Sequence, residues 1–342
     1  MSSETRPLLL PLTPLYRLAL AARELRLRSG LEQVRRLRHP VISIGNLSTG
    51  GSGKTPLTIA LAKALTARGF QVDILSRGYG RQSSLPAGVR FDGTADEFGE
   101  EPILIARETG LPVYVARQRF EAGQLAESDL AAAPESPAAQ AASAPRQMLH
   151  ILDDGFQHRQ LRRDANILLL DRRDFHDRLL PAGNLREPLK AIHRATVLAI
   201  PADDPQFESD LKTWGWKGPI WRLRRTMDVP TIDGPVAAFC GIARPNQFFD
   251  GLKAAGLQLA SRTAFPDHHR YTPNDLAALV SRARAAGAVA LITTQKDHIR
   301  LRSISCDLPI QIVPLTTEID HPDEALNALL AQLSTPPASR PL

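Results

Sequence analysis

Residues 41–58 bring together residue types that could hold a chain of phosphate groups. The apolar run Val41–Ile44 predicts a strand, a glycine-rich turn follows, and the run after Thr55 has helical spacing up to about Arg68. Glycines let backbone N–H groups approach phosphate oxygens, a lysine reaches the β- and γ-phosphates, and a threonine hydroxyl can bind Mg²⁺. We therefore expect a nucleotide triphosphate on Ser48, Thr49, Gly50, Gly51, Ser52, Gly53, Lys54 and Thr55.

This segment departs from the strict pattern G-x-x-x-x-G-K-[ST], because Ser48 stands where the first glycine belongs. It fits the variant x-G-G-x-G-K-T, which Thr49–Thr55 match. The alternative is a glycine-rich turn with an incidental lysine. The flanking strand and helix favour the phosphate site, because both fall where that mechanism needs them.

Two adjacent acids, Asp153 and Asp154, end the apolar strand predicted over Met148–Leu152. In phosphate-loop enzymes a carboxylate at this place holds Mg²⁺, directly or through water. Adjacent side chains point to different sides, so one acid could serve a metal and the other the acceptor or its proton. The alternative is an N-cap and turn, since Asp-Gly is common there. The upstream phosphate loop favours the metal role.

Two further segments carry cations on loops that follow strands or prolines. Ser76–Arg81 places two arginines on a glycine-bearing turn, which could grip an anionic substrate or a transferring phosphate. Leu180–Pro188 sets Arg186 beside Glu187 in a rigid loop. Taken alone, each segment is equally well explained by loop geometry.

Phe265–Tyr271 contains Asp267, His268 and His269, which could be metal ligands, a proton-transfer pair or an ordinary polar loop. A structural zinc site usually needs four ligands, and the two cysteines show no such spacing. A neutral histidine poised by a carboxylate could help to deprotonate a sugar hydroxyl. Thr293–Asp297 ends another strand, where it could cap an adenine or simply turn the chain.

The composition is that of a soluble globular protein. The chain has 342 residues, 43% of them hydrophobic and 23% charged, which suffices for one large or two ordinary α/β domains. Cys240 and Cys306 are too few for a disulfide framework and suit a reducing compartment. The net charge of +6 could attract phosphorylated sugar, nucleic acid or anionic lipid, and charge alone does not choose among them.

The N-terminal segment of residues 1–38 is apolar first and basic afterwards. Residues 8–22 are mostly apolar but too short to cross a bilayer, which takes roughly 20 apolar residues. A secretory signal would place its basic residues before the apolar stretch, and here most follow it. The segment is predicted either to lie on a membrane surface or to pack as a first helix on its own domain. The basic cluster in it consists of Arg17, Arg23, Arg26, Arg28, Arg35, Arg36 and Arg38.

Short β-branched or aliphatic runs alternate with helical patterns, which predicts an α/β fold with a doubly wound, mostly parallel sheet. The expected strands are Val41–Ile44, Val72–Leu75, Pro112–Val115, Met148–Leu152, Asn166–Leu170 and Thr196–Ile200. A second set is expected at Val236–Phe239, Leu257–Ala260, Ala288–Thr293 and Ile310–Val313. We expect a phosphate-loop nucleotide-binding domain over residues 39–225, with a surface insertion at about 122–147. A smaller α/β domain over 226–333 and a tail over 334–342 follow, the chain crossing between domains near Ile220–Asp233.

The order of these segments resembles the tetraacyldisaccharide 4′-kinases, the lipid A 4′-kinases of Gram-negative bacteria. The matching segments are Gly45–Pro56, Ser76–Arg81, Leu152–His158, Leu180–Pro188, Phe239–Gly241 with Phe248 and Phe249, Phe265–His268 and Thr293–Asp297. They cover about residues 40–300. One such segment would be weak support, whereas a collinear set is highly specific.

The resemblance implies transfer of the γ-phosphate of ATP to the 4′-hydroxyl of tetraacyldisaccharide 1-phosphate, with Mg²⁺ as cofactor. It implies catalytic roles for Glu100, His268, Asp154 and Lys54, and Mg²⁺ binding by Thr55, Asp153 and Glu187. It also implies that the substrate or the transferring phosphate meets Arg77, Tyr79, Gln157, His158 and Arg186.

The resemblance further implies two α/β/α domains joined by a β-ribbon linker. It implies attachment to the cytoplasmic face of the bacterial inner membrane through the N-terminal helix. The expected partners are therefore the lipid disaccharide and an anionic membrane surface. We expect no nucleic acid, and no obligate protein partner is evident.

One departure concerns the family motif Gly-Asp-Glu-Pro, which reads Gly99-Glu100-Glu101-Pro102 here. The family's aspartate works with the histidine that matches His268. Glu100 keeps the carboxylate but adds a methylene, and a shift of about 1 Å can cost on the order of 10²-fold in rate. We expect compensation rather than inactivity. Asn184 replaces a proline of another family motif, which we expect to be tolerated.

Two other classes of protein fit parts of the pattern. A nucleotide switch that hydrolyses ATP or GTP could use the same phosphate loop, but Thr294–Asp297 does not supply the Asn-Lys-x-Asp sequence that favours guanine. A non-enzymatic nucleic-acid binder would rest on charge alone, since only 5% of residues are aromatic and no recognition motif is evident.

Overall fold

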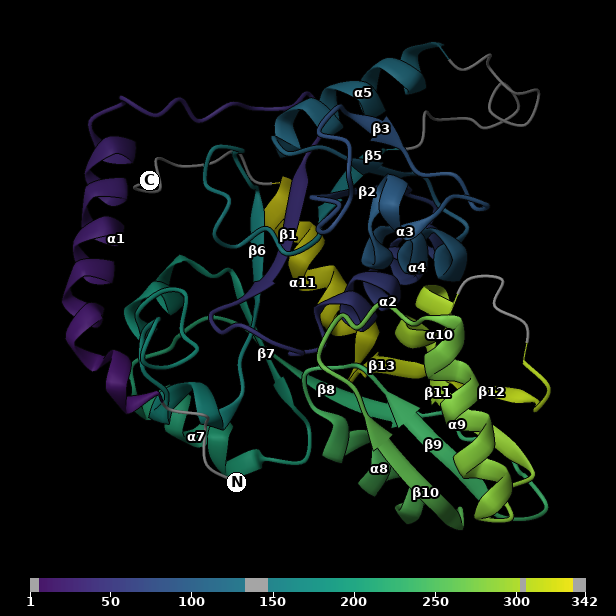
Figure 1. The fold of residues 1–342 in the computed structure, drawn as a ribbon. Coiled ribbons are helices and arrows are strands. Elements are labelled where there is room, and N and C mark those ends of the chain that lie inside the picture. Colours follow the sequence, from purple (N-terminus) through teal and green to yellow (C-terminus); the bar gives the residue numbers. More distant parts are fainter. Residues whose placement is uncertain (1–5, 133–146, 302–305, 335–342) are drawn as a thin grey trace.

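A nine-stranded sheet forms the centre of the larger part of the molecule (Figure 1). The computed structural model describes residues 6–132, 147–301 and 306–334. The strand order is β13-β8-β7-β6-β1-β5-β2-β4-β3. The strands are β1 (Val41–Asn46), β2 (Gln71–Ser76), β3 (Ala87–Gly88), β4 (Val113–Val115), β5 (Met148–Leu152), β6 (Ala165–Leu169), β7 (Val197–Pro201), β8 (Ile220–Met227) and β13 (Leu315–Ile319).

The central strands of this sheet are parallel, as predicted, and β1 lies between β5 and β6. Because carboxyl ends of parallel strands meet at one edge, the loops after β1, β2, β4 and β5 converge there. Only the outer strands β3 and β13 pair antiparallel with their neighbours among the described strands. The predicted strands of this part are confirmed, each within two residues of its observed bounds.

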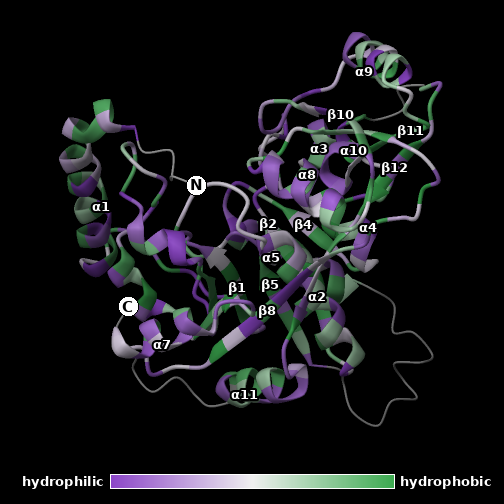
Figure 2. Ribbon diagram, turned by 90° about the horizontal axis from the view of Figure 1, so that it is seen from below, coloured by the Kyte–Doolittle hydropathy of each residue, from purple (hydrophilic) through white to green (hydrophobic). Residues whose placement is uncertain are grey.

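Helices surround this sheet, and those that pack on it bury its apolar side chains. They are η1 (Pro7–Leu12), α1 (Thr13–Arg28), α2 (Lys54–Ala67), α3 (Ala95–Phe98), α4 (Glu100–Thr109), α5 (Arg119–Ala132), η2 (Arg172–His176), η3 (Leu189–Arg194), α7 (Pro205–Thr213) and α11 (Pro322–Ser334). The largest core joins leucines of α2 to isoleucines of β1 and to Leu326 and Leu329 of α11. In Figure 2, α11 carries both hydrophobic and hydrophilic residues, as expected for a helix with one face on a core.

A smaller sheet of four parallel strands, in the order β10-β9-β11-β12, forms the second part. Its strands are β9 (Val236–Cys240), β10 (Leu259–Ala264), β11 (Ala290–Thr294) and β12 (Ile310–Val313). Helices α8 (Pro245–Ala254), α9 (Pro273–Ala285) and α10 (Gln295–Leu301) flank it (Figure 1). The prediction of a second, smaller α/β unit is therefore confirmed, although β10 begins two residues later than expected.

The bounds predicted for the smaller domain, 226–333, differ from the observed packing. β8 and β13 form an antiparallel pair at the edge of the large sheet, and α11 packs into the large core. The chain thus returns to the first part near Leu315. Sequence reasoning missed this return because β13 alternates exposed and buried residues at an edge, which leaves only a weak apolar signal.

The predicted surface insertion at 122–147 is helical in its first part. Helix α5 runs to Ala132 and buries the small residues Ala122, Gly123 and Ala126 against the sheet, so it contributes to a core. The small side chains matter, since a Cβ on Gly123 would approach Leu37 to 2.2 Å. The remainder of the insertion falls largely on residues 133–146, outside the described residues.

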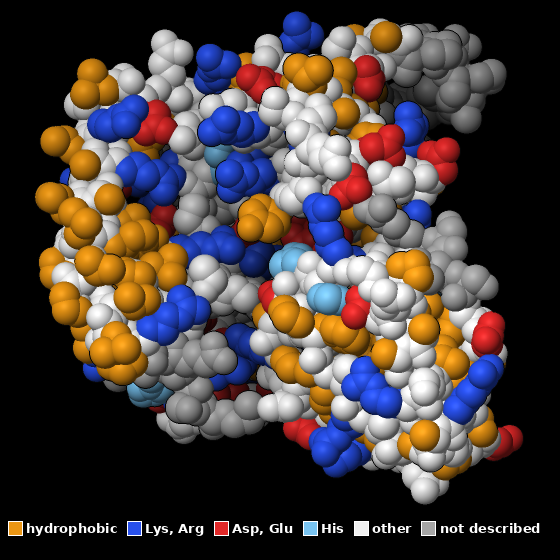
Figure 3. Space-filling model, viewed as in Figure 1, with side chains coloured by type: hydrophobic (Ala, Val, Ile, Leu, Met, Phe, Trp, Pro, Cys, Tyr) orange, Lys and Arg blue, Asp and Glu red, His pale blue; other side chains and the backbone are white. Residues whose placement is uncertain are grey.

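Helix α1 has two unlike faces. Tyr16, Leu20 and Leu27 turn toward the body of the protein, and the first two pack on the core that contains Leu47 and Phe156. On the opposite face Leu15, Leu18 and Leu25 are exposed by about two thirds each. Figure 3 shows hydrophobic side chains gathered at the left of the molecule, where α1 lies in Figure 1. Among the described residues, no helix has both the length and the apolar character that a membrane span requires.

Gly45 of β1 offers a test of how closely the phosphate loop and the acid pair are packed. A Cβ at this position would lie 2.5 Å from Phe156 Cβ and 2.8 Å from its backbone nitrogen, so the segment after Asp154 would have to move. Gly45→Ala is expected to lower the free energy of unfolding by about 1–3 kcal/mol in chemical denaturation. Gly88→Ala in β3, where the nearest atom is 3.7 Å away, is the control and should change it by less than about 0.5 kcal/mol. Equal effects of the two substitutions would contradict this packing.

Candidate active site

The phosphate loop connects β1 to α2 and lines a cavity of about 1050 Å³ between the two parts of the molecule. Gly53 takes a φ of 88° directly before α2, and a Cβ there would lie 2.8 Å from the Arg225 guanidinium. Glycine is therefore required on both backbone and steric grounds. Gly50 to Thr55 all line the cavity, with backbone N–H groups at the start of a 14-residue helix. This is the arrangement that binds anions.

Ser48 and Thr49 hold the loop in place and are not among the residues that line the cavity. The side-chain amide of Asn46 donates to the Ser48 carbonyl over 2.7 Å, and the Thr49 N–H donates to the Asn184 carbonyl over 2.8 Å. The phosphate loop predicted from the sequence is thus split. Gly50–Thr55 face the cavity, whereas Ser48 and Thr49 are tied to Asn46 and to the neighbouring loop.

Lys54 projects into the cavity and meets the second acid of the pair. Its Nζ donates to Asn46 Oδ1 over 3.1 Å and lies 3.6 Å from Asp154 Oδ1. Arg186 reaches the same carboxylate, with Nη1 at 3.0 Å from both oxygens. Burial raises the pKa of Asp154, but the charges of Lys54 and Arg186 outweigh it, and the net pKa is lowered. Asp154 is therefore a carboxylate near neutral pH.

Asp153 differs from its neighbour in surroundings and in charge state. It is buried and accepts a hydrogen bond from Thr58 Oγ1 over 3.0 Å. Burial, followed by the charges of Glu101 and Asp154, raises the pKa of Asp153 to about 7. Excess negative charge is thus concentrated beside the phosphate loop. A cation there would relieve it.

The oxygen donors around Asp153 suit a hard divalent cation. Thr55 and Asp153 both line the cavity, and Thr55 Oγ1 donates to Glu101 Oε1 over 3.3 Å. Among the described residues no group of three or more His, Cys, Asp or Glu side chains could hold a metal ion by itself. Mg²⁺ is usually bound by one or two protein oxygens together with phosphates and water, and Thr55 and Asp153 offer two such oxygens at the cavity. The donor set therefore fits Mg²⁺ brought in with a nucleotide.

Glu187, which the sequence also suggested as a metal ligand, is directed elsewhere. Its carboxylate pairs with Arg194 and lies 3.9 Å from Arg23, and the residue does not line the cavity. Two arginines already neutralise it in a buried position. The structure thus leaves Thr55 and Asp153, without Glu187, at the predicted metal position.

Glu100 and His268 meet across the boundary between the two parts. Glu100 is the first residue of α4, where the helix dipole favours a carboxylate, and its Oε2 lies 3.1 Å from His268 Nδ1. Burial by itself would raise the pKa of Glu100. The hydrogen bond with His268 and the charge of Arg300 together outweigh burial, so the net pKa is lowered. The hydrogen bond with Glu100 raises the pKa of His268 despite partial burial. The longer glutamate side chain therefore reaches the histidine.

Glu101 forms a second link between the parts. Lys296 Nζ, from the first turn of α10, lies 2.6 Å from Glu101 Oε1. Thr294, Gln295 and Lys296 all line the cavity. Asp297, by contrast, is fully buried and accepts hydrogen bonds from the Gly241 N–H and the Tyr271 hydroxyl, so it supports the loop rather than facing a ligand.

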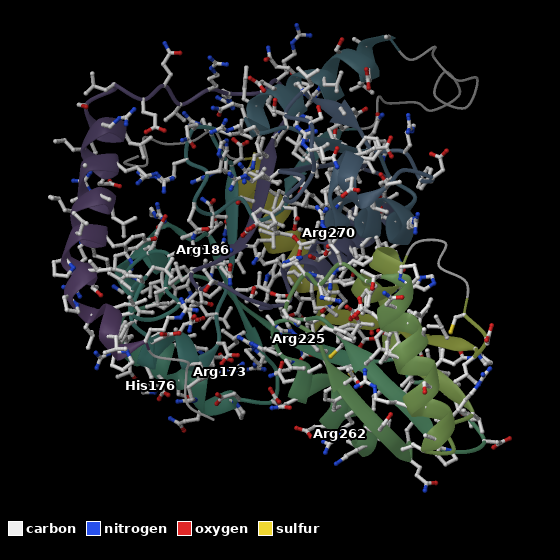
Figure 4. The ribbon with its side chains drawn as sticks, viewed as in Figure 1. Arg173, His176, Arg186, Arg225, Arg262 and Arg270 are labelled. Atoms are coloured by element: carbon white, nitrogen blue, oxygen red, sulfur yellow. The ribbon has the colours of Figure 1, made fainter. Side chains whose placement is uncertain are left out.

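The substrate-binding residues expected from the sequence all line the cavity. They are Arg77, Tyr79, Gln157, His158 and Arg186. Gln157 Nε2 donates to the Asn46 carbonyl over 2.9 Å, which ties Gln157 to the strand before the phosphate loop. The rings of Tyr79 and His268 are 6.0 Å apart. On the face shown in Figure 3, Lys and Arg side chains border a hollow in the middle of the molecule, and Figure 4 shows Arg186 and Arg225 in that central region.

Comparison with known proteins agrees with this geometry. The family model described as tetraacyldisaccharide-1-P 4′-kinase matches residues 5–334. A tetraacyldisaccharide 4′-kinase of Koribacter versatilis is 39% identical over 332 residues, covering 94% of this chain and 97% of that protein. One of Neisseria gonorrhoeae is 35% identical, covering 93% and 89%.

The chain belongs to the tetraacyldisaccharide 4′-kinase family. It is accordingly a kinase that acts in lipid A biosynthesis. A crystal structure of LpxK from Aquifex aeolicus in complex with ATP superposes with a TM-score of 0.71 at 31% identity, covering 95% of this chain and 98% of that one. This agreement confirms the phosphate-loop kinase fold predicted from the sequence.

Several residues of the kinase site were not singled out by sequence reasoning. Arg119 lies after β4 and lines the cavity, and burial followed by the charge of Arg77 lowers its pKa to about 10. Its place beyond the carboxyl end of a strand, like that of Arg77, was a signal that could have found it. Arg225 donates to the Ser52 carbonyl over 2.5 Å, and Arg300 contacts Glu100. Neither has a local sequence signal, because each acts on a distant segment.

The two histidines of the cavity are expected to titrate differently. Burial, together with nearby arginines of which Arg119 is the first, lowers the pKa of His158 to about 3, so its ring should stay neutral from about pH 5 to 8. The hydrogen bond with Glu100 raises the pKa of His268. As the pH is lowered, its ring should therefore gain a proton at a higher pH than an unperturbed histidine does. NMR shifts of the imidazole Cε1–H groups against pH, assigned with His158→Gln and His268→Gln, measure both. A His158 midpoint near 6.5, the unperturbed value, would contradict the buried environment described.

Proposed function

We propose that this kinase transfers the γ-phosphate of ATP to the 4′-hydroxyl of tetraacyldisaccharide 1-phosphate inside the cavity between the two parts of the molecule. One observation carries the proposal. Lys54 of the phosphate loop and the Glu100–His268 pair, which joins both parts, line the same cavity. A nucleotide held by the first and a hydroxyl held by the second would be close enough to react.

The phosphate tail of ATP is proposed to lie on the amides of Gly50–Thr55, with Lys54 at its β- and γ-phosphates. The nucleotide base is proposed to lie at the apolar end of the cavity. That end is lined by Met227, Ile242, Phe248, Val313 and Leu315. Met227 and Leu315 come from the β8–β13 ribbon and the other three from the smaller part, so the base would contact both parts.

Mg²⁺ is proposed to bind Thr55 and Asp153 together with the phosphates. When bound, it would neutralise charge on the transferring group. Asp154 stays ionised between Lys54 and Arg186, and so keeps both cations directed at the phosphates. Arg77 and Arg186 would offset the remaining negative charge of the phosphate or the substrate.

His268 is proposed to be the general base. With Nδ1 bonded to Glu100, its Nε2 is the atom that would accept the proton of the 4′-hydroxyl. The hydroxyl O–H bond breaks, its oxygen forms a bond to the γ-phosphorus, and the bond from that phosphorus to the β-phosphate oxygen breaks to release ADP. Glu100 then stabilises the imidazolium ion.

Lys54→Ala tests the nucleotide part of this proposal. Removing a preorganised cation from the transferring phosphate should lower kcat by at least about 10²–10³-fold, with little change in thermal stability. The assay is mass-spectrometric detection of phosphorylated disaccharide formed from ATP and the lipid acceptor. Lys63→Ala, an exposed lysine on the same helix, is the matched control and should retain the parent rate. Equal rates for Lys54→Ala and the parent would overturn the proposal, and ATP hydrolysis that ignores the acceptor would point to a nucleotide switch.

We also infer that the exposed face of η1 and α1 rests on an anionic membrane surface at the cytoplasmic side of the inner membrane. Leu8 is 93% exposed, and Leu15, Leu18 and Leu25 share the outer face of α1. Arg17, Arg26 and Arg28 flank this face and could contact lipid headgroups. Arg23, from the inner face of α1, lines the cavity, and this nearness of α1 to the cavity supports the inference.

Replacing two of the outer leucines tests the membrane inference. Burying a leucine side chain is worth about 1.5–3 kcal/mol and tenfold in affinity corresponds to about 1.4 kcal/mol, so Leu15→Glu/Leu18→Glu should weaken vesicle binding at least about tenfold. Co-sedimentation with vesicles containing phosphatidylglycerol measures it. Leu85→Glu, an exposed leucine far along the chain from α1, should bind as the parent does. Unchanged binding of the double variant would refute the inference.

A further inference from the structure

Arg300 is a buried arginine in the last turn of α10 that contacts the carboxylate of the proposed proton-transfer pair. Its Nε lies 2.8 Å from Glu100 Oε2, the same oxygen that meets His268 Nδ1 at 3.1 Å. The side chain of Arg300 is only 3% exposed. It does not line the large cavity, so it is not placed to touch a nucleotide or an acceptor there. Any effect of Arg300 on the reaction would therefore pass through Glu100.

The guanidinium is held in one orientation by the smaller part of the molecule. Its Nη1 donates to Asp297 Oδ1 over 3.0 Å and to the Gly241 carbonyl over 2.7 Å. Asp297 is itself fixed, because its oxygens accept hydrogen bonds from the Gly241 N–H, the Tyr271 hydroxyl and Thr294. Arg300 thus acts as a rigid extension of β9 and α10 that reaches across to α4.

The same carbonyl also supports the histidine. The His268 N–H donates to the Gly241 carbonyl over 3.1 Å, and His268 adopts a φ of 59°, a left-handed conformation that few residues other than glycine adopt. Arg300 and the His268 backbone therefore share one acceptor. Both partners of the proton-transfer pair are held by one group of atoms around Gly241.

Such support is needed because the pair lies between two cavities. Glu100 and His268 line the large cavity and also a second one of about 290 Å³, which Arg300, Arg270 and Tyr271 help to enclose. A glutamate side chain has three rotatable bonds and could turn toward either space. A cation fixed on the side away from the nucleotide would hold the carboxylate against the imidazole.

We propose that Arg300 is a positioning residue for phosphoryl transfer, which holds the Glu100 carboxylate ionised and aligned with His268 and so couples docking of the smaller part to assembly of the pair. This inference rests on the roles proposed above for Glu100 and His268. The other charged groups that face the pair are Asp267, Asp297, Asp96 and Arg270. Asp96 and Arg270 pair with each other at 3.4 Å, and Asp297 pairs with Arg300 itself.

The positive charge of Arg300 shifts the pKa values of Glu100 and His268 in the same direction. It lowers the pKa of Glu100 and also lowers the pKa of His268, opposing Glu100 and Asp267. Without that charge, the imidazole should hold its proton to higher pH. The acidic limb of the kcat/KM profile, where the base must be neutral, should then move to higher pH.

The experiment compares two variants. Arg300→Met removes the positive charge, whereas Arg300→Lys keeps the charge but lacks the planar guanidinium that contacts Glu100, Asp297 and Gly241 at once. Arg300→Met is expected to lower kcat about 10–100-fold, to leave KM for ATP within about twofold, and to shift the acidic limb upward. Arg300→Lys should keep the acidic limb near its original position and recover part of kcat. Val280→Ala is the control for lost stability, because Val280 packs in the core of the smaller part away from the Glu100–His268 pair. It should leave the acidic limb of the kcat/KM profile at its original pH.

A double-mutant cycle separates positioning from folding. If Arg300 acts through Glu100, Arg300→Met should cost less than about twofold in kcat when Glu100 is already alanine. Additive losses in the cycle, or Arg300→Met with a lower Tm but an unshifted pH profile, would overturn the inference and leave Arg300 a structural residue. Full activity of Glu100→Ala and His268→Ala would instead overturn the proposed proton-transfer pair itself, so the two failures are distinguishable.

Discussion

The two parts of this kinase are joined by ion pairs between acids of α4 and cations of α10, and these pairs constrain how the parts meet. Helix α4 of the larger part begins with Glu100 and Glu101, and α10 of the smaller part carries Lys296 and Arg300. The side chain of Arg300 is 3% exposed and that of Glu100 16%, and an unpaired charge in such a place would be costly. The two parts must therefore meet with these helices in register. That register brings His268 beside Glu100.

Burial and neighbouring charges also give the acids near the phosphate loop different protonation states. Asp154 is surrounded by cations and stays ionised, whereas Asp153 is buried beside other carboxylates and has a pKa raised to about 7. Two adjacent residues of similar chemistry thus present different charge states to one cavity. Glu187 is a third acid nearby, but arginines already neutralise it. Environment rather than residue type decides which acid is available to a cation.

Family membership and geometry support each other at Glu100. The sequence suggested that the extra methylene of glutamate would need compensation. The structure places the carboxylate in hydrogen-bond range of His268 and braces it from behind with Arg300. Because Arg300 fixes its carboxylate, the longer glutamate can present an oxygen to His268 as well as a shorter aspartate without such a contact could. The compensation lies in a residue some 200 positions away along the chain.

The sequence by itself determined the local features of this protein. The phosphate loop, the acid pair at the end of β5 and the central parallel strands depend on neighbours within a few residues, and glycine positions and apolar runs record them directly. The roles of Glu100, His268 and Glu187 came from resemblance to a family, and of these three Glu187 is not at the cavity.

Only the tertiary structure decided the contacts that join distant segments. Glu100 and His268 are separated by 168 positions, and the return of β13 and α11 to the large sheet depends on an edge strand and a helix face with no local signature. Arg300 could not be found from its own surroundings in the sequence, since its chemistry is set by Gly241, Asp297 and Glu100. Burial and charge pairing are properties of the folded neighbourhood, and the linear pattern of residues does not contain them.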